Sequence, residues 1–153
     1  MNKKYLVAIL IINLIIFIDQ ITKYIASIFL THNIIKPITN FLNLSLVYNA
    51  GMAFGNFAYA NGWQHWILLF ITAIIIFLLI LWLRKQQSIM QIIALSMIIG
   101  GAIANYLDKL LLRYVRDFID FHILDWHFAT FNIADTAISI GVFLFLITIF
   151  KKE

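Results

Sequence analysis

The sequence predicts an all-α integral membrane protein with four transmembrane helices and a small β-sheet on the membrane surface. Of its 153 residues, 63% are hydrophobic and 12% are charged, whereas soluble domains have about 45–50% apolar and about 25% charged residues. The mean hydropathy is +0.96. The apolar residues form runs close to the ~20 residues that cross ~30 Å of hydrocarbon, and basic residues occur in pairs near the ends of those runs.

The first predicted span runs from about residue 5 to 30 and is interrupted by Asp19 and Lys23. These residues are four apart with the acid N-terminal to the base, an arrangement that favours an ion pair on one helical face. Asn-Lys-Lys before an apolar stretch is also typical of a secretory signal peptide. We expect a membrane span instead, because the stretch continues past Asp19 and no convincing A-x-A cleavage site follows it.

The connection from 31 to 65 contains a predicted strand. Between residues 41 and 48, leucines and a final tyrosine alternate with mostly polar positions, which is the period of two typical of a strand. Asn49-Ala-Gly51 breaks this pattern, and residues 52–57 are apolar and aromatic. We expect a small sheet here.

Three further spans complete a single transmembrane domain over residues 1–153. They cover about 66–83, 89–107 and 131–150, with a second long connection at 108–130. The third span carries Gly100, Gly101 and Ala104 on one face, which favours close helix packing.

Basic pairs predict the orientation of the four spans. Lys3–Lys4, Arg84–Lys85 and Lys151–Lys152 fall on one side of the bilayer if the chain crosses it four times. The positive-inside rule makes that side cytoplasmic. Both termini are therefore expected in the cytoplasm, and the two long connections outside.

Aspartates carry the candidate chemistry. Asp135 begins an apolar run that contains no other charge as far as Phe150, and a carboxylate in such a segment indicates a functional site. Asp117, in an aromatic-rich loop, is a candidate partner. Two carboxylates that share a proton can act as general base and general acid, which is the chemistry of aspartic proteases. From spacing alone, Asp108 or Asp120 is an equally allowed partner for Asp135.

Other chemistries have less support. The absence of cysteine excludes disulfides and thiolate sites, and no two histidines are spaced to share a helical face, so we expect neither a metal nor a cofactor. None of the five serines has a Gly-x-Ser-Gly setting. The scattered basic residues do not favour nucleic acid. A non-catalytic alternative is a membrane subunit whose aspartates bind protons or cations along a path through the bundle.

Five motifs resemble, in order and position, those of bacterial lipoprotein signal peptidase (signal peptidase II). They are residues 19–23, 49–55, 100–109, 115–120 and 131–135. The resemblance covers essentially the whole chain. It implies an aspartic endopeptidase of the bacterial inner membrane that removes the signal peptide of lipidated prolipoproteins before the diacylglyceryl-cysteine. Membrane lipids are the other expected partner.

The resemblance also implies the layout of the site. The two catalytic residues fall on Asp117 and Asp135, near the outer face of the membrane. The expected supporting residues are Asp19, Lys23, Asn49, Gly51, Asn105, Asp108, Lys109, Arg116 and Asn132. An extracytoplasmic sheet that cradles the substrate and a short amphipathic helix are expected beside them.

Three positions depart from the family pattern. Lys109 stands where arginine is usual, which removes a bidentate fork, and we expect it to pair with Asp108. Arg116 stands where a small apolar residue usually precedes Asp117, and we expect this cation beside the dyad to lower its pKa values. Ala104 replaces a usual glycine. A divergent member that binds lipoproteins without cutting them is therefore a further alternative.

Overall fold

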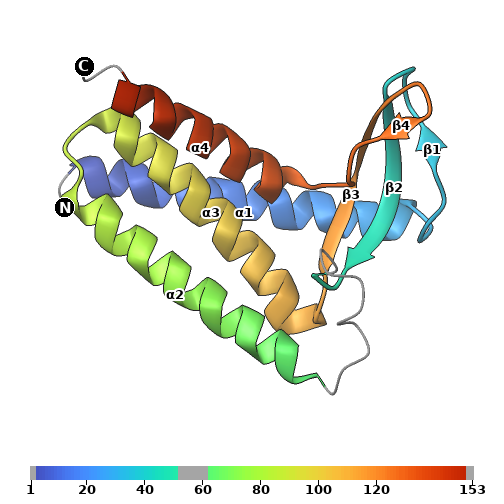
Figure 1. The fold of residues 1–153 in the computed structure, drawn as a ribbon, viewed down its shortest axis with the longest axis horizontal. Coiled ribbons are helices and arrows are strands. Elements are labelled where there is room, and N and C mark those ends of the chain that lie inside the picture. The colour runs from blue at the N-terminus through green and yellow to red at the C-terminus, as the bar shows by residue number, and fades with distance from the viewer. Residues whose placement is uncertain (1–2, 52–61, 151–153) are drawn as a thin grey trace.

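The computed structural model describes residues 3–51 and 62–150, in which four long helices form a bundle with a small sheet at one end (Figure 1). The helices are α1 (Lys3–Phe29), α2 (Trp63–Lys85), α3 (Ile89–Leu112) and α4 (Ile133–Phe150). The strands are β1 (Lys36–Pro37), β2 (Leu42–Asn49), β3 (Val115–Ile123) and β4 (Trp126–His127). This confirms the predicted combination of four helices and a small sheet.

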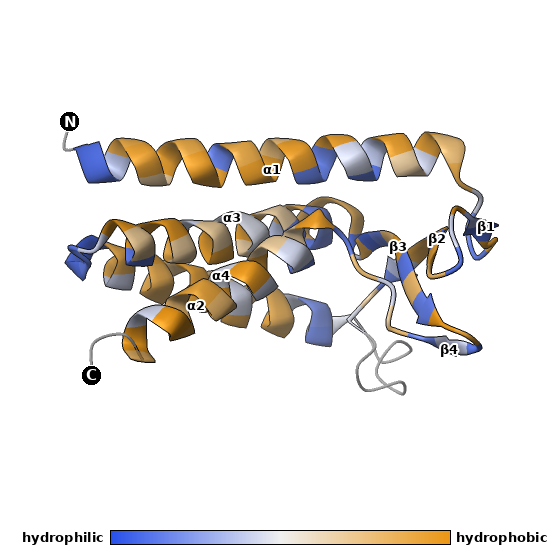
Figure 2. Ribbon diagram, turned by 90° about the horizontal axis from the view of Figure 1, so that it is seen from above, coloured by the Kyte–Doolittle hydropathy of each residue, from blue (hydrophilic) through white to orange (hydrophobic). Residues whose placement is uncertain are grey.

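Each helix is long and apolar enough to cross a membrane. Figure 2 shows that hydrophobic residues dominate the helices, while polar residues collect at the start of α1 and in the sheet. Large apolar side chains point outward, including Phe17 on α1, Phe70 on α2 and Phe143 on α4, which are 64%, 68% and 64% exposed. Apolar surface of this extent is suited to contact with lipid.

The helix α3 lies at the centre and packs against the three other helices. At Gly101, an added Cβ would stand 2.5 Å from the backbone oxygen of Ala134 on α4. At Gly141, it would stand 2.7 Å from the backbone oxygen of Ala94. The absence of a side chain at these two positions therefore permits the close approach of α3 and α4, as is common for membrane helices.

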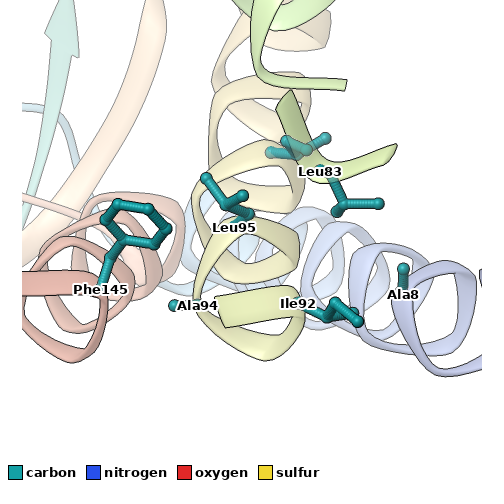
Figure 3. Packing of buried hydrophobic residues seen from close by; sticks show 7 residues of the cluster. Ala8, Leu83, Ile92, Ala94, Leu95 and Phe145 are labelled. Carbon is teal, nitrogen blue, oxygen red and sulfur yellow. The ribbon is translucent and has the colours of Figure 1, made fainter. Parts of the chain in front are cut away.

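The main apolar core draws on all four helices (Figure 3). Ala8 of α1, Leu83 of α2, Leu95 of α3 and Phe145 of α4 belong to one buried cluster. A second cluster joins the sheet to the bundle through Ala26, Leu46 and Phe118. The sheet is thereby packed onto the end of α1.

The four strands are antiparallel in the order β1-β2-β3-β4. The pairing of β2 with β3 places Val47 opposite Asp117, with an irregularity between Leu44 and Val47. After β4 the chain returns along β3, where Phe131 exchanges backbone hydrogen bonds with Ile119 at 2.9 and 3.0 Å. This return brings the start of α4 next to the middle of β3.

Apart from α1 to α4, the described ranges contain no other helix. Residues 52–57, the apolar and aromatic segment, lie outside the described residues. The short amphipathic helix therefore stays a prediction.

Candidate active site

Asp117 and Asp135 lie on different elements that meet at the sheet end of the bundle. Asp117 is on β3 and is only 2% exposed. Asp135 is in the first turn of α4 and is half-buried. Both side chains line the same cavity.

Asn132 contacts both aspartates. Its Nδ2 donates a hydrogen bond to Asp117 Oδ1 at 2.6 Å, and its backbone N–H donates to Asp135 Oδ2 at 3.2 Å. Asn132 is fully buried, so these bonds are shielded from competing water. One residue therefore connects the two carboxylates across two elements.

The start of α4 is held by a capping box. Asn132 Oδ1 accepts the N–H of Asp135 at 3.0 Å, and the Asp135 carboxylate bonds back to the N–H of Asn132. The Asp19 carboxylate of α1 accepts the N–H of Ala134 at 2.8 Å. Free N–H groups and the helix dipole both favour an anion at this end. These bonds define where α4 begins and hence where the Asp135 carboxylate lies.

Asn105 of α3 connects the dyad to a buried ion pair. Its Nδ2 donates to Asp135 Oδ1 at 2.8 Å, and its Oδ1 accepts from Lys23 Nζ at 2.8 Å. Lys23 Nζ also lies 2.7 Å from Asp19 Oδ2, and both side chains are 0% exposed. This confirms the predicted ion pair on α1.

The turn after β2 directs a second amide at Asp117. Asn49 Nδ2 donates to Asp117 Oδ2 at 3.0 Å, while Asn49 Oδ1 accepts the N–H of Gly51 at 2.9 Å. Gly51 has a φ of 94°, a left-handed conformation that glycine adopts without the cost of a Cβ. Each carboxylate oxygen of Asp117 thus has one amide donor.

The cavity has a volume of about 530 Å³, within the range of ligand-binding pockets. Its apolar lining includes Trp63, Ile67 and Leu68 of α2. Its polar lining comprises Asn49, Gln64, Thr72, Asn105, Tyr106, Lys109 and the two aspartates. A peptide segment with apolar side chains matches this mixture of surfaces.

Burial raises the pKa of Asp117 from 3.8 to about 6. Hydrogen bonds from Asn49 and Asn132 oppose this rise in pKa, and the nearby carboxylate of Asp135 adds to it. A carboxyl group with this pKa holds a proton more readily than an ordinary aspartate. Asp117 is therefore suited to a pair of carboxylates that shares one proton.

The other candidate partners of Asp135 are engaged elsewhere. Asp120 Oδ2 accepts a hydrogen bond from Asn43 at 2.9 Å, and Asp120 Oδ1 lies 2.8 Å from His127 Nδ1. Burial opposes ionisation of Asp120, but these contacts outweigh it and lower its pKa. Asp108 bonds to Arg116 and Gln20. Of the three candidate partners, Asp117 is the one that lines the same cavity as Asp135 and shares the contacts of Asn132 with it.

Residues 11–151 match the family model of signal peptidase (SPase) II. The chain belongs to the signal peptidase II family. It is 48% identical over 136 residues to a lipoprotein signal peptidase of Coxiella burnetii strain RSA 493, covering 88% of this chain and 83% of that protein. It is 41% identical over 139 residues to that of Hydrogenovibrio crunogenus, covering 90% and 81%.

The fold is similar to that of a solved bacterial membrane enzyme. A bacterial membrane enzyme solved by the in meso method at 1.9 Å resolution superposes with a TM-score of 0.84 at 32% identity, covering 95% of this chain and 94% of that one. Together with the four apolar helices, these similarities identify the chain as a multi-pass membrane protein.

The expectation that Arg116 lies beside the dyad is wrong. Arg116 instead forms a fork with Asp108 of α3, with Nη2 2.7 Å from Oδ1 and Nε 3.2 Å from Oδ2. Its Nη2 also donates to Gln20 Oε1 at 3.1 Å. Neighbouring residues of a strand point to opposite faces, so the side chains of Arg116 and Asp117 diverge. The pKa of Asp117 is accordingly raised by burial and not lowered by Arg116.

The expected pair of Asp108 with Lys109 is also wrong. Asp108 pairs with Arg116 at 2.7 Å and with Lys23 at 3.5 Å. Lys109 lines the cavity, with its Nζ 3.6 Å from the position of an added Cβ at Gly51. Consecutive residues of a helix do not face each other, which explains why the two side chains separate.

We expect Arg116 to act on the site indirectly, by holding α3 in position. The helix α3 carries both Asp108, which binds Arg116, and Asn105, which binds Asp135. We therefore expect Arg116→Val to lower kcat several-fold. It should also destabilise the protein by about 2 kcal/mol, the loss typical of charged hydrogen bonds. The midpoint of the pH–rate profile should not move. Thermal unfolding and cleavage rates over a pH series measure both effects.

Arg116→Lys separates geometry from charge. It keeps the cation but loses the planar fork, so we expect a kcat closer to that of Arg116→Val than to the wild type. A displaced pH profile in either variant would contradict a purely geometric role.

Two glutamines of the site were not predicted. Gln20 Nε2 donates to Asp108 Oδ1 at 3.0 Å and to the Ala104 backbone oxygen at 3.2 Å. Gln64 lines the cavity. Gln20 lies inside the motif at 19–23, three residues before Lys23, so its helical position was available as a signal. Gln64 follows Trp63 at the boundary of a span, where polar residues are ordinary.

Proposed function

We propose that this protein removes signal peptides from lipidated prolipoproteins, with Asp117 and Asp135 as its catalytic residues. Family membership supports the activity, because signal peptidase II is an aspartic peptidase family whose named members include lipoprotein signal peptidases. The single observation that carries the residue assignment is the bridge by Asn132, which bonds to both carboxylates at the edge of one cavity.

The proposed reaction is an acid–base hydrolysis. The ionised member of the pair takes a proton from water as the water oxygen attacks the scissile carbonyl carbon, while the protonated member donates to the carbonyl oxygen. The tetrahedral intermediate then collapses, its C–N bond breaks, and the leaving nitrogen takes up a proton. The products are a carboxylate on the signal peptide and a free amino group on the lipidated cysteine.

The polar groups around the cavity provide hydrogen-bond partners for the backbone of a substrate that is unwound in an apolar setting. Unpaired backbone groups cost several kcal/mol in hydrocarbon, so a helical signal peptide needs hydrogen-bond partners where it is opened for attack. Asn49, Asn105 and Lys109 are placed along the cavity wall. The diacylglyceryl chains and the membrane lipids would lie against the exposed apolar faces of the helices.

The proposed orientation puts the site near the outer face of the bacterial inner membrane. Lys4 Nζ donates to the backbone oxygen of Gln86 at 3.3 Å, so the start of α1 and the connection from α2 to α3 lie at one end. This end carries two of the basic pairs, and the sheet is at the other end (Figure 1). The positive-inside rule then makes both termini cytoplasmic.

Cleavage by the purified wild-type protein tests this proposal. A prolipoprotein carrying diacylglyceryl-cysteine should be cut to a product whose N-terminal residue is that cysteine, as read by mass spectrometry. The same polypeptide without the lipid is the matched control and should be cut much more slowly. Binding of the lipidated substrate without cleavage would instead support a member that binds lipoproteins without cutting them.

The arrangement of the aspartates gives no support to a proton- or cation-binding subunit. That alternative requires acidic side chains distributed along a path through the bundle. Asp19, Asp108, Asp117 and Asp135 instead belong to one connected set of hydrogen bonds at the sheet end.

A further inference from the structure

The outward face of α1 carries an amide side chain in the middle of its span. Asn13 is exposed and lies ten residues after Lys3. Ten residues rise about 15 Å along a helix, which is half of the ~30 Å of hydrocarbon that a span crosses. Within α1 to α4 as described, every other asparagine or glutamine side chain is buried or half-buried. Asn13 is therefore the one amide of these described helices that faces lipid.

The Asn13 side chain has unused hydrogen-bonding groups. Its Nδ2 donates to the backbone oxygen of Ile9 at 2.8 Å, which uses one of its two N–H groups. No described residue donates a hydrogen bond to its Oδ1. A polar group without a partner is costly in hydrocarbon, because no water is present to replace the missing bond. Asn13 is therefore suited to a partner that brings both a donor and an acceptor to the same depth.

Asn13 belongs to a stripe of exposed residues along α1, which we call the α1 stripe. The other members are Leu10, Phe17, Ile21 and Tyr24, which are 60%, 64%, 42% and 62% exposed. Successive members are three or four residues apart, which is the spacing of one helical face and of the seam between two paired helices. The helix α1 lies along one side of the bundle and packs its other faces against α3 and α4 (Figure 2). No described element of the chain covers the α1 stripe.

We propose that the α1 stripe is a dimer interface, in which α1 of a second copy packs in parallel and the two Asn13 side chains bond to each other. All copies of a membrane protein insert with the same orientation, so they place Asn13 at the same depth. A two-fold axis along the membrane normal brings the same residue of both copies together. Each Oδ1 then accepts an N–H from the Nδ2 of the other copy.

A second copy fits the α1 stripe better than the substrate does. The core of a signal peptide is an apolar run and offers no side-chain amide at a fixed depth. No described residue of α1 lines the cavity that contains Asp117 and Asp135, so a peptide bound there leaves Asn13 uncovered. The dimer is therefore independent of the proposed function, and its tests require no cleavage.

Association in lipid vesicles measures the contribution of Asn13. The full chain is labelled through Gln87→Cys, an exposed position in a chain without native cysteine. It is reconstituted into phosphatidylcholine vesicles at a series of protein-to-lipid ratios, and single-molecule photobleaching counts the copies in each particle. Chains with Asn13 should form dimers as the protein density rises. Asn13→Leu should raise the dissociation constant about tenfold, which corresponds to 1.4 kcal/mol for two lost interhelical hydrogen bonds.

Two comparisons separate association from folding. Asn13→Gln keeps an amide and should retain most of the dimer. The unfolding temperature of the detergent-solubilised monomer should be the same for Asn13→Leu and the wild type, because Asn13 bonds only to its own helix. If Asn13→Leu does not fold, Asn13→Ala takes its place.

Disulfide crosslinking locates the interface. Two cysteines join when their Cα atoms come within about 7 Å of each other. Since the two-fold axis runs between the α1 helices, Leu10→Cys and Phe17→Cys should each crosslink to the same position of the second copy. Phe70→Cys on α2 and Phe143→Cys on α4 are the matched controls, because these phenylalanines are 68% and 64% exposed, close to the 64% of Phe17. The controls should remain uncrosslinked.

Three outcomes would overturn the proposal. A wild-type chain that stays monomeric at every protein-to-lipid ratio excludes a second copy as the partner of the α1 stripe. Asn13→Leu that dimerises as strongly as the wild type shows that the amide does not bind across the interface. Crosslinks at Phe70→Cys or Phe143→Cys, with none at Phe17→Cys, place the contact between copies on another face.

Discussion

Replacing Asp117 or Asp135 by asparagine should abolish cleavage of a lipidated prolipoprotein. Asparagine keeps the shape of aspartate but can neither take a proton from water nor return one to the leaving nitrogen. Positioned acid–base groups contribute about 10²–10⁴-fold in rate, and removal of either member stops a pair that works as a unit. We therefore expect a fall in kcat of about 10³-fold or more in each single variant.

Asp125→Asn is the matched control for this prediction. Asp125 is exposed on the connection between β3 and β4, so its replacement should leave the rate of cleavage unchanged. Rates are measured by mass spectrometry of the released signal peptide under single-turnover conditions. Cleavage by Asp117→Asn at the wild-type rate would remove this residue from the dyad.

The stability of Asp117→Asn should show that the loss of activity is not a loss of fold. The pKa of Asp117 is raised from 3.8 to about 6, so the folded protein binds this proton more tightly than the unfolded chain. The favourable contribution is present below pH 3.8 and is lost as pH rises through about 6. The variant lacks this dependence. Between pH 4 and pH 8 its stability relative to the wild type should therefore improve by up to about 3 kcal/mol, as measured by thermal unfolding.

Lys23→Met should give the largest loss of stability. Lys23 Nζ is 2.7 Å from Asp19, 2.8 Å from Asn105 and 3.5 Å from Asp108, and its side chain is 0% exposed. Its removal leaves Asp19 buried without a counter-charge, and breaking a buried pair from one side costs about 3–5 kcal/mol. Asn105, which positions Asp135, also loses one of the two donors to its Oδ1. Cleavage should therefore fall together with the unfolding temperature.

Two further variants test the cause of this loss. Lys23→Met combined with Asp19→Asn removes both charges, and the asparagine oxygen can still accept the N–H of Ala134, so stability should recover in part. Lys36→Met removes an exposed lysine of β1 and should change neither stability nor activity. A Lys23→Met protein as stable as the wild type would show that the buried pair is not required for the fold.

Periodicity and composition were sufficient to predict the helices, because both are local properties of the chain. The uncharged runs beginning near Trp66 and Ile89 allow little besides membrane helices, and the pair Asp19 and Lys23 meets because residues four apart share a helical face. The strand at Leu42–Asn49 showed its period of two in the same way. Its partner β3 could not be read from alternation, because apolar and polar residues do not alternate in the first part of Val115–Ile123, Val-Arg-Asp-Phe-Ile-Asp.

Spacing left Asp117, Asp108 and Asp120 open as partners of Asp135, and the resemblance to the family pointed to Asp117; the contacts around these residues join positions far apart in sequence. Asn132 reaches Asp117 across 15 positions, and Asn105 reaches Asp135 across 30. The same limit explains the error on Arg116, whose sequence neighbour is Asp117 but whose spatial partners are Asp108 and Gln20. Adjacent positions on a strand face opposite sides, so sequence proximity gave the wrong neighbour.

The sequence by itself determined the membrane class, the helices and, through its ordered motifs, the family. Only the tertiary structure showed how Asp117 and Asp135 come to line one cavity, because that depends on where β3 and α4 are joined by Phe131 and Asn132. It also revealed Gln64 Oε1 as a buried acceptor without a partner among the described residues. Burial of a single atom is set by packing between elements, and no local pattern of residues encodes it.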